Sequence, residues 1–233
     1  MNLDFSDDQK FLQSEARKFL EKEDSIKRSR NVLDKSGSVD RDLWEKIIAL
    51  GWTGVRIPDQ FDGLGLGHLE LCVIAEELGR FLAPVPFSSS VYLFTETIIK
   101  YGSEELKKDI LPKLVSGEVI GTLAVTEDFL APTSSNITTE VTNNKINGKK
   151  IAVPDAGIAT HSIIVCKSSN GIDLRLIDLS DKSLSISSQD TVDDSRGHFC
   201  IELDNTPSIL VGEENNGWEL YESIINQAAV LFS

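Results

Sequence analysis

Two adjacent carboxylates, Glu76 and Glu77, are the residues in the first half of the chain best suited to acid–base chemistry. A general acid or base needs a shifted pKa, and neighbouring carboxylates can shift one another. Both fall with Glu70 in the segment 68–82, where apolar residues recur at helical spacing. Carboxylates on a helix flank more often face water or pair with arginine. We therefore expect all three on the wetter side of a helix, without a catalytic role.

The glycine-rich run PDQFDGLGLG, residues 58–67, is a candidate phosphate cradle. Its glycines, Gly63, Gly65 and Gly67, are spaced two apart and lack the third glycine placement of a dinucleotide fingerprint. No Lys-Ser or Lys-Thr pair follows, as a nucleotide-binding loop would require. The run is more typical of a tight turn before a helix, because glycine accepts backbone angles that strain other residues.

The thiols and imidazoles show no pattern of a metal site. Cys72, Cys166 and Cys200 are odd in number, widely spaced and set in apolar or strand-like surroundings. This arrangement predicts buried free thiols in a reducing compartment. The three histidines lie far from one another and lack zinc-ligand spacing. We predict no metal.

Composition excludes several classes of function. A formal net charge of −14 argues against nucleic acid, whose affinity for proteins comes largely from lysine and arginine. The first ten residues, MNLDFSDDQK, are acidic and polar, unlike a signal peptide. No run approaches the ~18 apolar residues of a membrane span. We expect no membrane span and a cytoplasmic location, with an organelle matrix as the alternative.

The chain changes character within residues 101–127, YGSEELKKDILPKLVSGEVIGTLAVTE. Ser103 is suited to cap a helix and Gly117 to end it. Residues 119–125 then have the pattern of a strand, which ends in the polar pair Thr126–Glu127. The sequence therefore predicts a helical unit joined to a β unit with almost no linker.

Before this junction, apolar residues recur at helical spacing. Ser6 and Gln9 have the pattern of a capping box at the start of a first helix. Asp40 is suited to cap a second helix, and residues 88–90 a later one. Residues 21–38 are charged and irregular, so we predict a loop or a frayed helix end there.

After the junction, apolar residues alternate in short runs, as in a small sandwich or barrel. The pair Asn143–Asn144 tolerates the positive φ angles of a hairpin turn. From Trp218 onward the chain has the pattern of a long apolar helix, which stops abruptly at Ser233. Such a helix needs a partner, so we expect the chain to be unfinished.

Several stretches, in this order, resemble segments of the acyl-CoA dehydrogenase family. The family's P-x-x-x-G-G-x-G segment and the helix after it are similar to PDQFDGLGLGHLELCVIAEELGR. Its Y-G-[ST]-E-E-x-K segment, which leads into a T-E strand, is similar to residues 101–127. Its D-x-T-R strand pair is similar to VDDSRGHFCIELDNTP, and its turn into the C-terminal bundle is similar to LVGEENNGWEL. The similarity runs along essentially the whole chain.

The resemblance implies an α+β multidomain fold. Residues 1–118 would form an N-terminal all-α helical domain. Residues 119–213 would form a small antiparallel β-barrel or sandwich domain. Residues 214–233 would be the first helix of a truncated C-terminal helical bundle.

The resemblance also implies a FAD-dependent acyl-CoA dehydrogenase, which carries out α,β-dehydrogenation of an acyl-CoA thioester. In the family a base removes the α-proton, and the β-hydride passes to FAD between the β domain and the helical bundle. Pro132 would line the path of the CoA thioester. Carried over by position, the cofactor-binding residues are Leu123, Val125, Thr126, Ala152, Val153 and Pro154.

Departures from the family pattern leave two hypotheses open. Phe129-Leu130-Ala131-Pro132-Thr133 replaces the family's G-A-G-S-D loop, and Ala152 replaces its flavin-shielding tryptophan. Pro154 replaces a Thr or Ser and offers neither a hydroxyl nor a backbone N–H. Either flavin binds here through backbone contacts, or the chain is a non-catalytic partner or scaffold subunit of a heteromeric enzyme with a degraded flavin site.

The resemblance places the general base, a carboxylate of the C-terminal bundle, outside this sequence. We therefore predict no catalytic residue within it and no activity from this chain alone. The implied partners are an acyl-CoA substrate, an electron-transferring flavoprotein as acceptor, and further subunits in a homo- or hetero-oligomer.

Overall fold

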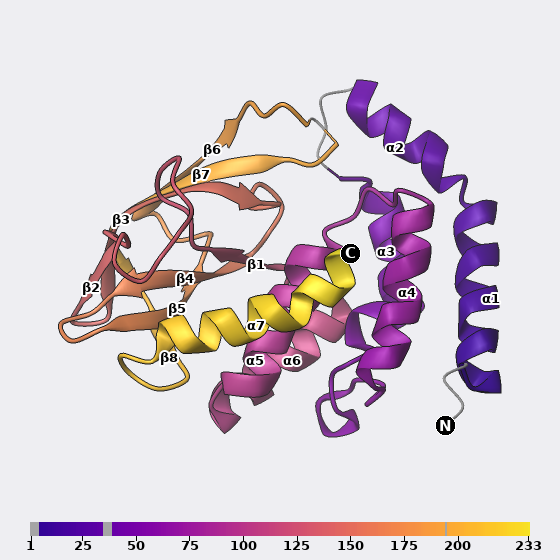
Figure 1. The fold of residues 1–233 in the computed structure, drawn as a ribbon, viewed down its shortest axis with the longest axis horizontal. Coiled ribbons are helices and arrows are strands. Elements are labelled where there is room, and N and C mark those ends of the chain that lie inside the picture. Colours follow the sequence, from indigo (N-terminus) through magenta and orange to yellow (C-terminus); the bar gives the residue numbers. More distant parts are fainter. Residues whose placement is uncertain (1–4, 35–38, 194) are drawn as a thin grey trace.

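A computed structural model describes residues 5–34, 39–193 and 195–233. Helices fill the first half of the chain, β-strands most of the second, and one helix closes it (Figure 1). None of the helices in these residues is long and apolar enough to cross a membrane. The helices before the sheet are α1 (Asp7–Lys22), α2 (Ser25–Asp34), α3 (Arg41–Ala49), α4 (His68–Arg80), the π-helical segment η3 (Ser88–Thr95), α5 (Glu96–Tyr101) and α6 (Glu104–Ser116).

Local capping signals set three helix starts as predicted. The predicted cap at residues 88–90 is wrong, because these residues lie inside η3 and no side chain caps its start. Ser6 and Gln9 form the capping box of α1, with hydrogen bonds in both directions. The Asp40 carboxylate accepts the N–H of Leu43 at 2.9 Å at the start of α3. Ser103 caps α6, and Gly117 ends that helix with a φ of +76°. These ends depend on neighbouring residues only, which is why the sequence predicts them.

The predicted loop over residues 21–38 is wrong, because α2 occupies Ser25–Asp34. Residues 35–38 lie outside the described residues. The charges that obscured the helix pair with one another: Arg28 contacts Glu23 at 2.8 Å and Asp40 at 3.1 Å. Val32 is buried beneath them. Ion pairs between residues of different elements thus stabilise a helix that the spacing of apolar residues does not predict.

The β unit is one eight-stranded sheet with the order β6-β7-β3-β2-β4-β5-β8, and β1 pairs with β4. Most pairs are antiparallel, as predicted, but β1 and β4 are parallel and the path of paired strands does not close. Asn143 and Asn144 form the hairpin turn between β2 and β3, with φ angles of +51° and +60°. The strands are β1 (Gly121–Ala124), β2 (Glu140–Thr142), β3 (Lys145–Pro154), β4 (His161–Lys167), β5 (Ile172–Asp178), β6 (Leu184–Gln189), β7 (His198–Pro207) and β8 (Ile209–Val211).

Strand β1 lies where the helical and β units meet, and all four of its residues are buried. Leu123 packs in the hydrophobic core that the helices share, whereas Ala124 packs in a second core inside the sheet. A Cβ at Gly121 would lie 2.0 Å from Phe94 of η3, so only glycine lets the two units approach this closely. The Gly121 N–H also donates to Ser90 of η3 at 3.2 Å.

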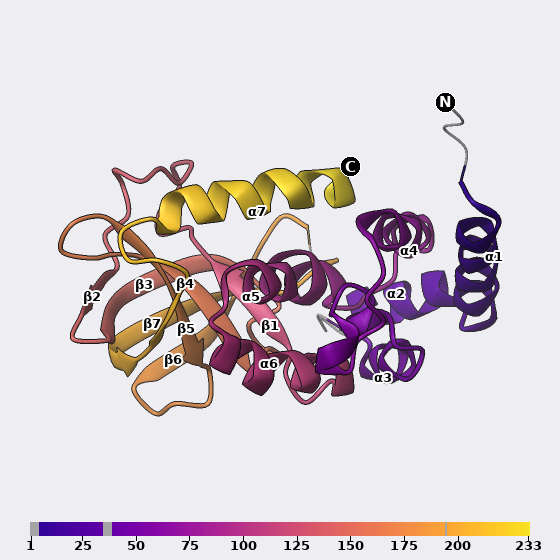
Figure 2. The ribbon, with the colours of Figure 1, turned by 90° about the horizontal axis from the view of Figure 1, so that it is seen from below.

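The last helix, α7 (Gly217–Phe232), runs from the end of the sheet along the helices, and Figures 1 and 2 place it beside α5. Its buried side holds Ile224 and Ala228. Gln227 donates to the buried carboxylate of Glu96 in α5 at 2.8 Å. One face of this helix therefore does find a partner within the chain, although Phe232 near its end stays 53% exposed.

The expectation that Glu77 lies on the solvent-facing side of α4 is wrong, because the residue is fully buried. Arg17 of α1 donates to both of its oxygens, at 2.6 and 3.0 Å. The Nε atom of Arg80 also lies near this carboxylate, 3.5 Å from its Oε2 atom. Glu76, by contrast, is exposed as predicted. The glutamate pair thus splits into a structural ion pair and a solvated residue.

Replacing Arg17 with methionine should destabilise the fold, because the Glu77 carboxylate would stay buried with only Arg80 beside it. Arg17 is 42% exposed, so the expected loss in the free energy of unfolding is measurable but smaller than that for a fully buried pair. Urea unfolding measures it, with Lys18→Met, an exposed neighbour, as control. Equal losses for the two variants would contradict this account of Glu77.

Candidate active site

The structure brings the two predicted flavin-contacting segments side by side. The Thr126 carbonyl accepts the N–H of Ile151 at 2.8 Å, so the residues after β1 run next to β3. Leu123 and Val153 are buried, Val125, Thr126 and Pro154 are half-buried, and Ala152 is exposed. The arrangement makes one continuous edge of the predicted residues, whose contact with flavin stays a prediction.

Hydrogen-bond donors on this edge are few. The Ala152 N–H already donates to the Gln189 side chain at 2.6 Å, and Pro154 has no N–H to offer. The Thr126 hydroxyl has no hydrogen-bond partner among the residues that the structure describes. The edge therefore has one free side-chain donor, Thr126, for a polar ring. It fits a flavin less well than the family's pattern of residues does.

Ala152 has a φ of +51°, in the left-handed region that residues with a Cβ rarely adopt. It sits at a register shift between β3 and β7, where the pairing slips between Lys150 and Val153. A bulge of this kind turns the side chain of Ala152 out of the sheet's regular alternation. A tryptophan could be restored here only against the same backbone strain.

Glu127 and Lys150 form a buried ion pair at the end of the same edge. Their N–O distance is 2.6 Å, and the Lys150 ammonium also donates to the Val125 carbonyl at 3.1 Å. Burial would raise the pKa of Glu127, but attraction to Lys150 and hydrogen bonds from Lys150 and Thr138 outweigh it and lower that pKa to about 2. The sequence shows the Thr-Glu pair but not its lysine. This ion pair fixes the backbone just after Thr126.

Asp155, the residue after the predicted edge, joins the helical and β units. It is 1% exposed, and its Oδ2 accepts from Ser89 of η3 at 2.5 Å and from Arg196 at 2.6 Å. Sequence reasoning missed Asp155, although Arg196 stands at the arginine of the D-x-T-R resemblance. The carboxylate thereby positions both Pro154 and the helical wall opposite it.

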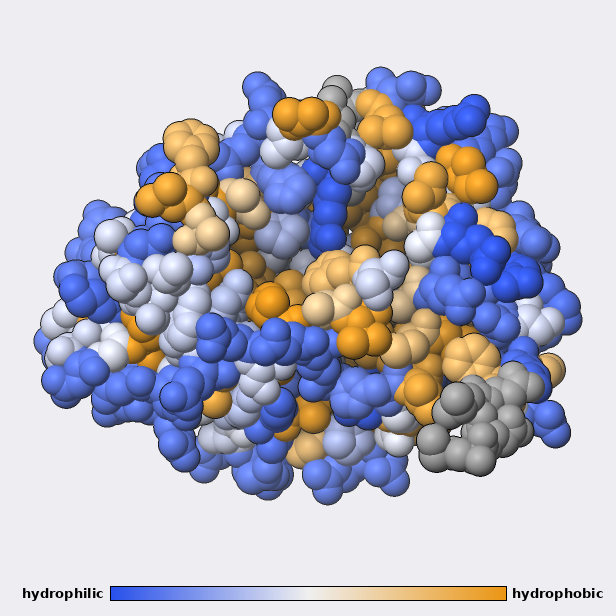
Figure 3. Space-filling model, viewed as in Figure 1, coloured by the Kyte–Doolittle hydropathy of each residue, from blue (hydrophilic) through white to orange (hydrophobic). Residues whose placement is uncertain are grey.

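A cavity of about 360 Å³ opens beside Asp155, between α4, η3 and the end of α7. Figure 3 shows a hollow in the middle of this face of the molecule, with hydrophobic residues in its depth and hydrophilic ones across its upper part. Pro132 does not line this cavity. Its loop continues to Ser134 and Ser135, which line a separate cavity of about 570 Å³ beside the start of α7.

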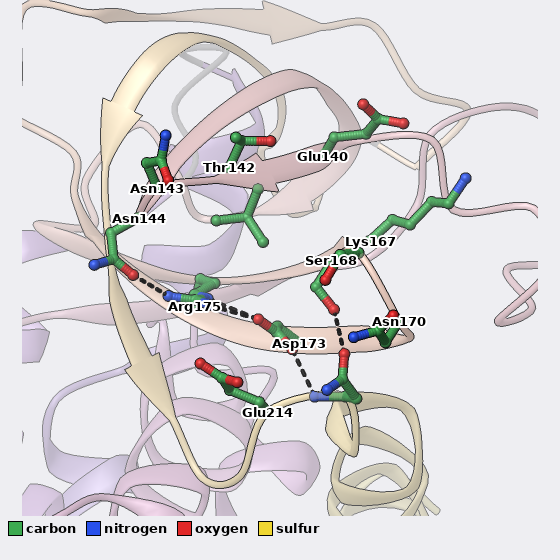
Figure 4. A pocket seen from close by; sticks show the side chains of 13 residues that line it. Glu140, Thr142, Asn143, Asn144, Lys167, Ser168, Asn170, Asp173, Arg175 and Glu214 are labelled. Carbon is green, nitrogen blue, oxygen red and sulfur yellow. Dashed lines mark hydrogen bonds and ion pairs between the residues drawn. The ribbon is translucent and has the colours of Figure 1, made fainter.

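A third cavity, of about 550 Å³, lies at the β2–β3 hairpin and the β4–β5 turn (Figure 4). Its buried charges satisfy one another: Arg175 donates to Asp173 at 2.6 Å and to Asn144 at 2.7 Å. The second oxygen of Asp173 accepts the Asn215 N–H at 2.8 Å. This network holds the hairpin and the approach to α7 together, and we interpret it as structural.

The described residues contain no cluster of three or more histidines, cysteines or carboxylates placed to hold a metal ion. All three cysteines are free thiols. Cys166 and Cys200 are buried as predicted, whereas Cys72 is only half-buried. Burial raises the pKa of the Cys166 thiol to about 12. It is therefore an apolar core residue rather than a nucleophile.

The family described as "Acyl-CoA dehydrogenase, N-terminal domain" matches residues 6–118. Acyl-CoA dehydrogenase FadE29 of Mycobacterium tuberculosis is 25% identical over 245 aligned residues, which cover 99% of this chain and 63% of the relative. Residues 6–118 thus form an acyl-CoA dehydrogenase N-terminal domain. The chain spans less than two thirds of the length of this relative.

Solved structures of acyl-CoA dehydrogenases confirm the fold of the chain. Butyryl-CoA dehydrogenase from Megasphaera elsdenii has a TM-score of 0.88 at 20% identity, covering 99% of this chain and 66% of that one. A glutaryl-CoA dehydrogenase from Mycobacterium smegmatis, solved in complex with FADH2, has a TM-score of 0.85 at 18% identity, covering 96% and 60%. The helical part, the sheet and the final helix are thus arranged as in acyl-CoA dehydrogenases.

Acid should weaken the fold partly through Glu127. Its pKa in the folded state, about 2, lies below the ordinary value of 4.5, so its contribution is complete above pH 4.5 and is lost as pH falls toward 2. Urea unfolding at several pH values should show a stability gap between the wild type and Glu127→Gln that narrows over this range. Glu140→Gln, at an exposed position, is the control; a gap independent of pH would contradict the assignment.

Proposed function

We propose that this chain is the N-terminal helical domain (1–118), the middle β domain (119–213) and the first bundle helix (214–233) of a FAD-dependent acyl-CoA dehydrogenase that oxidises an acyl-CoA thioester at its α and β carbons. The observation that carries the proposal is the position of the Thr126 edge. It lies beside Ala152 to Pro154, and Pro154 leads directly into Asp155 at the apolar cavity. The match of residues 6–118 to the acyl-CoA dehydrogenase N-terminal domain supports the same function.

In this proposal each part of the site has a separate role. FAD, when bound, supplies the acceptor for the β-hydride. Thr126 donates a hydrogen bond toward the flavin ring, and Leu123, Val125, Ala152, Val153 and Pro154 supply its contact surface. The loop at Pro132 borders the path of the CoA thioester, and the cavity at Asp155 receives the acyl chain and excludes water.

We assign removal of the α-proton to a carboxylate outside these 233 residues. Asp155 is the one carboxylate among the described residues that line the acyl cavity, and Ser89 and Arg196 already occupy it. Both bonds fall on the same oxygen, Oδ2, so we assign Asp155 to positioning its neighbours rather than to catalysis. This chain alone should therefore bind ligands without turning over.

Ala152 and Pro154 favour a second candidate function, that of a non-catalytic partner or scaffold subunit in a heteromeric acyl-CoA dehydrogenase. At these positions the chain provides neither an aromatic shield nor a hydroxyl, and the Ala152 N–H is taken by Gln189. Under either function we propose a cytoplasmic homo- or hetero-oligomer, with an electron-transferring flavoprotein as electron acceptor of the assembled enzyme.

Flavin content separates the two functions. The chain is purified alone and with a candidate partner chain, and the flavin absorbance band is compared with protein concentration. A near-stoichiometric band supports the enzyme. Colourless protein under both conditions would leave the scaffold role and exclude the FAD-dependent one for this chain.

Replacing Thr126 with valine should weaken FAD binding about tenfold, the effect of one lost hydrogen bond to a polar ring. The expected change is a higher dissociation constant in a fluorescence titration with FAD, at unchanged thermal stability. Thr142→Val, an exposed threonine on β2, is the matched control. Equal affinities for Thr126→Val and the wild type would remove Thr126 from the proposed flavin edge.

Replacing Pro154 with threonine should tighten FAD binding, because it restores a hydroxyl and a backbone N–H at the family's donor position. This exchange avoids the left-handed backbone at Ala152, where a tryptophan would be strained. The same FAD titration measures the effect. A dissociation constant that does not fall would show that this strand is not aligned with the family's flavin strand.

A further inference from the structure

The cavity of about 360 Å³ at Asp155 is apolar over most of its wall. Its size lies at the lower end of the ~300–1,000 Å³ typical of small-molecule sites. Polar groups enter the wall at a few points only, among them Tyr92, Asp155 and Arg196. Its apolar lining includes Leu33, Leu78, Leu82, Val85, Phe87 and Phe232.

Tyr92 is a buried polar side chain of this wall, and the protein leaves its hydroxyl unsatisfied. The residue is only 5% exposed, and its hydroxyl has no hydrogen-bond partner among the described residues. The hydroxyl oxygen is not one of the fully enclosed unsatisfied atoms, which are those of Ser25, Trp44 and Thr95. It therefore reaches open space, and the open space that Tyr92 lines is this cavity.

Aromatic packing holds the Tyr92 ring in this position. Phe87 contacts it edge-on with ring centroids 5.5 Å apart, and Phe232 of α7 does the same at 5.7 Å. A ring held between Phe87, just before η3, and Phe232 of α7 presents its hydroxyl in a fixed direction. Buried tyrosine hydroxyls usually have a partner, because leaving one without a hydrogen bond costs free energy. An oxygen atom on a bound ligand would supply it.

The charges in the cavity wall cancel. Arg196 donates two hydrogen bonds to Asp155, at 3.2 and 2.6 Å, so the pair presents no net charge to a ligand. A neutral acceptor therefore suits the site better than a carboxylate, which would need a cation of its own. The chemistry that fits is an otherwise apolar acyl group bearing a hydroxyl or keto oxygen.

We propose that Tyr92 determines substrate specificity by donating a hydrogen bond to a neutral oxygen on the acyl group, so that the cavity selects oxygen-bearing acyl thioesters over plain hydrocarbon ones. The inference rests on the proposed function, because it takes the cavity at Asp155 as the acyl site. It adds the chemical class of the substrate, which similarity to the family leaves open.

Two matched pairs of thioesters test the inference: octanoyl-CoA with 7-oxooctanoyl-CoA, and cyclohexanecarbonyl-CoA with its 4-oxo derivative. Calorimetry on the purified chain gives the dissociation constants. The wild type should bind the oxo member of at least one pair about tenfold more tightly, as expected for one buried hydrogen bond. Tyr92→Phe should abolish that preference and leave the plain thioesters within about twofold. Tyr221→Phe, the same change outside the cavity, should keep the preference.

A second measurement on the wild type avoids dependence on the variant's folding. The chain has three tyrosines, so protein carrying carbon-13 at the tyrosine ζ position gives three NMR signals, and Tyr92→Phe identifies one of them. The preferred oxo thioester should move the Tyr92 signal more than its plain counterpart does.

The outcomes separate the two proposals. Equal affinities within both pairs, with a Tyr92 signal that responds alike to both members, overturn the role of Tyr92 and leave the acyl site standing. A chain that binds none of the four thioesters overturns the acyl site, and the proposed function with it.

Discussion

The relation of the helices to the sheet depends on one carboxylate oxygen. Asp155 Oδ2 accepts directly from Ser89 on the helical side and from Arg196 on the sheet side. Charge-assisted hydrogen bonds of this length are strong and directional. Because Asp155 directly follows Pro154, the position of the helical wall is transmitted to the edge that we propose for flavin. The close approach of Gly121 to Phe94 allows this geometry, and Asp155 fixes it.

Ion pairs with at least one buried member recur where this chain joins distant segments. Lys150 with Glu127 fixes the backbone after β1, Arg17 with Glu77 docks α1 on α4, and Arg175 with Asp173 anchors the hairpin near α7. Such pairs gain little net free energy over apolar contacts, but an unpaired member is costly. Their main effect is therefore to specify one arrangement of the segments, and they add less to the stability of the fold. The overall charge of −14 resides mainly elsewhere, on the solvated surface.

Sequence patterns predicted the parts of the fold that are decided locally. The caps at Ser6, Asp40 and Ser103 and the turn at Asn143–Asn144 depend on residues within a few positions, and the structure has all of them. The helix α2 and the burial of Glu77 escaped prediction because their partners come from other elements. For the site, position in the chain identified the edge at Thr126, whereas Asp155, Lys150 and Tyr92 gain their roles only from residues that folding brings near them.

The π-helical segment Ser88–Thr95 has a consequence for how this cavity can change during evolution. Its backbone hydrogen bonds join residues five apart, whereas those of an α-helix join residues four apart. The segment therefore contains the equivalent of a one-residue insertion into an α-helix. Loss of one residue would restore α-helical spacing and rotate the flanking parts by about 100° relative to each other. Tyr92 would then turn relative to Ser89, which Asp155 holds in place. Single-residue insertions and deletions in this segment, rather than substitutions alone, thus offer homologues a route to a differently lined cavity on an unchanged scaffold.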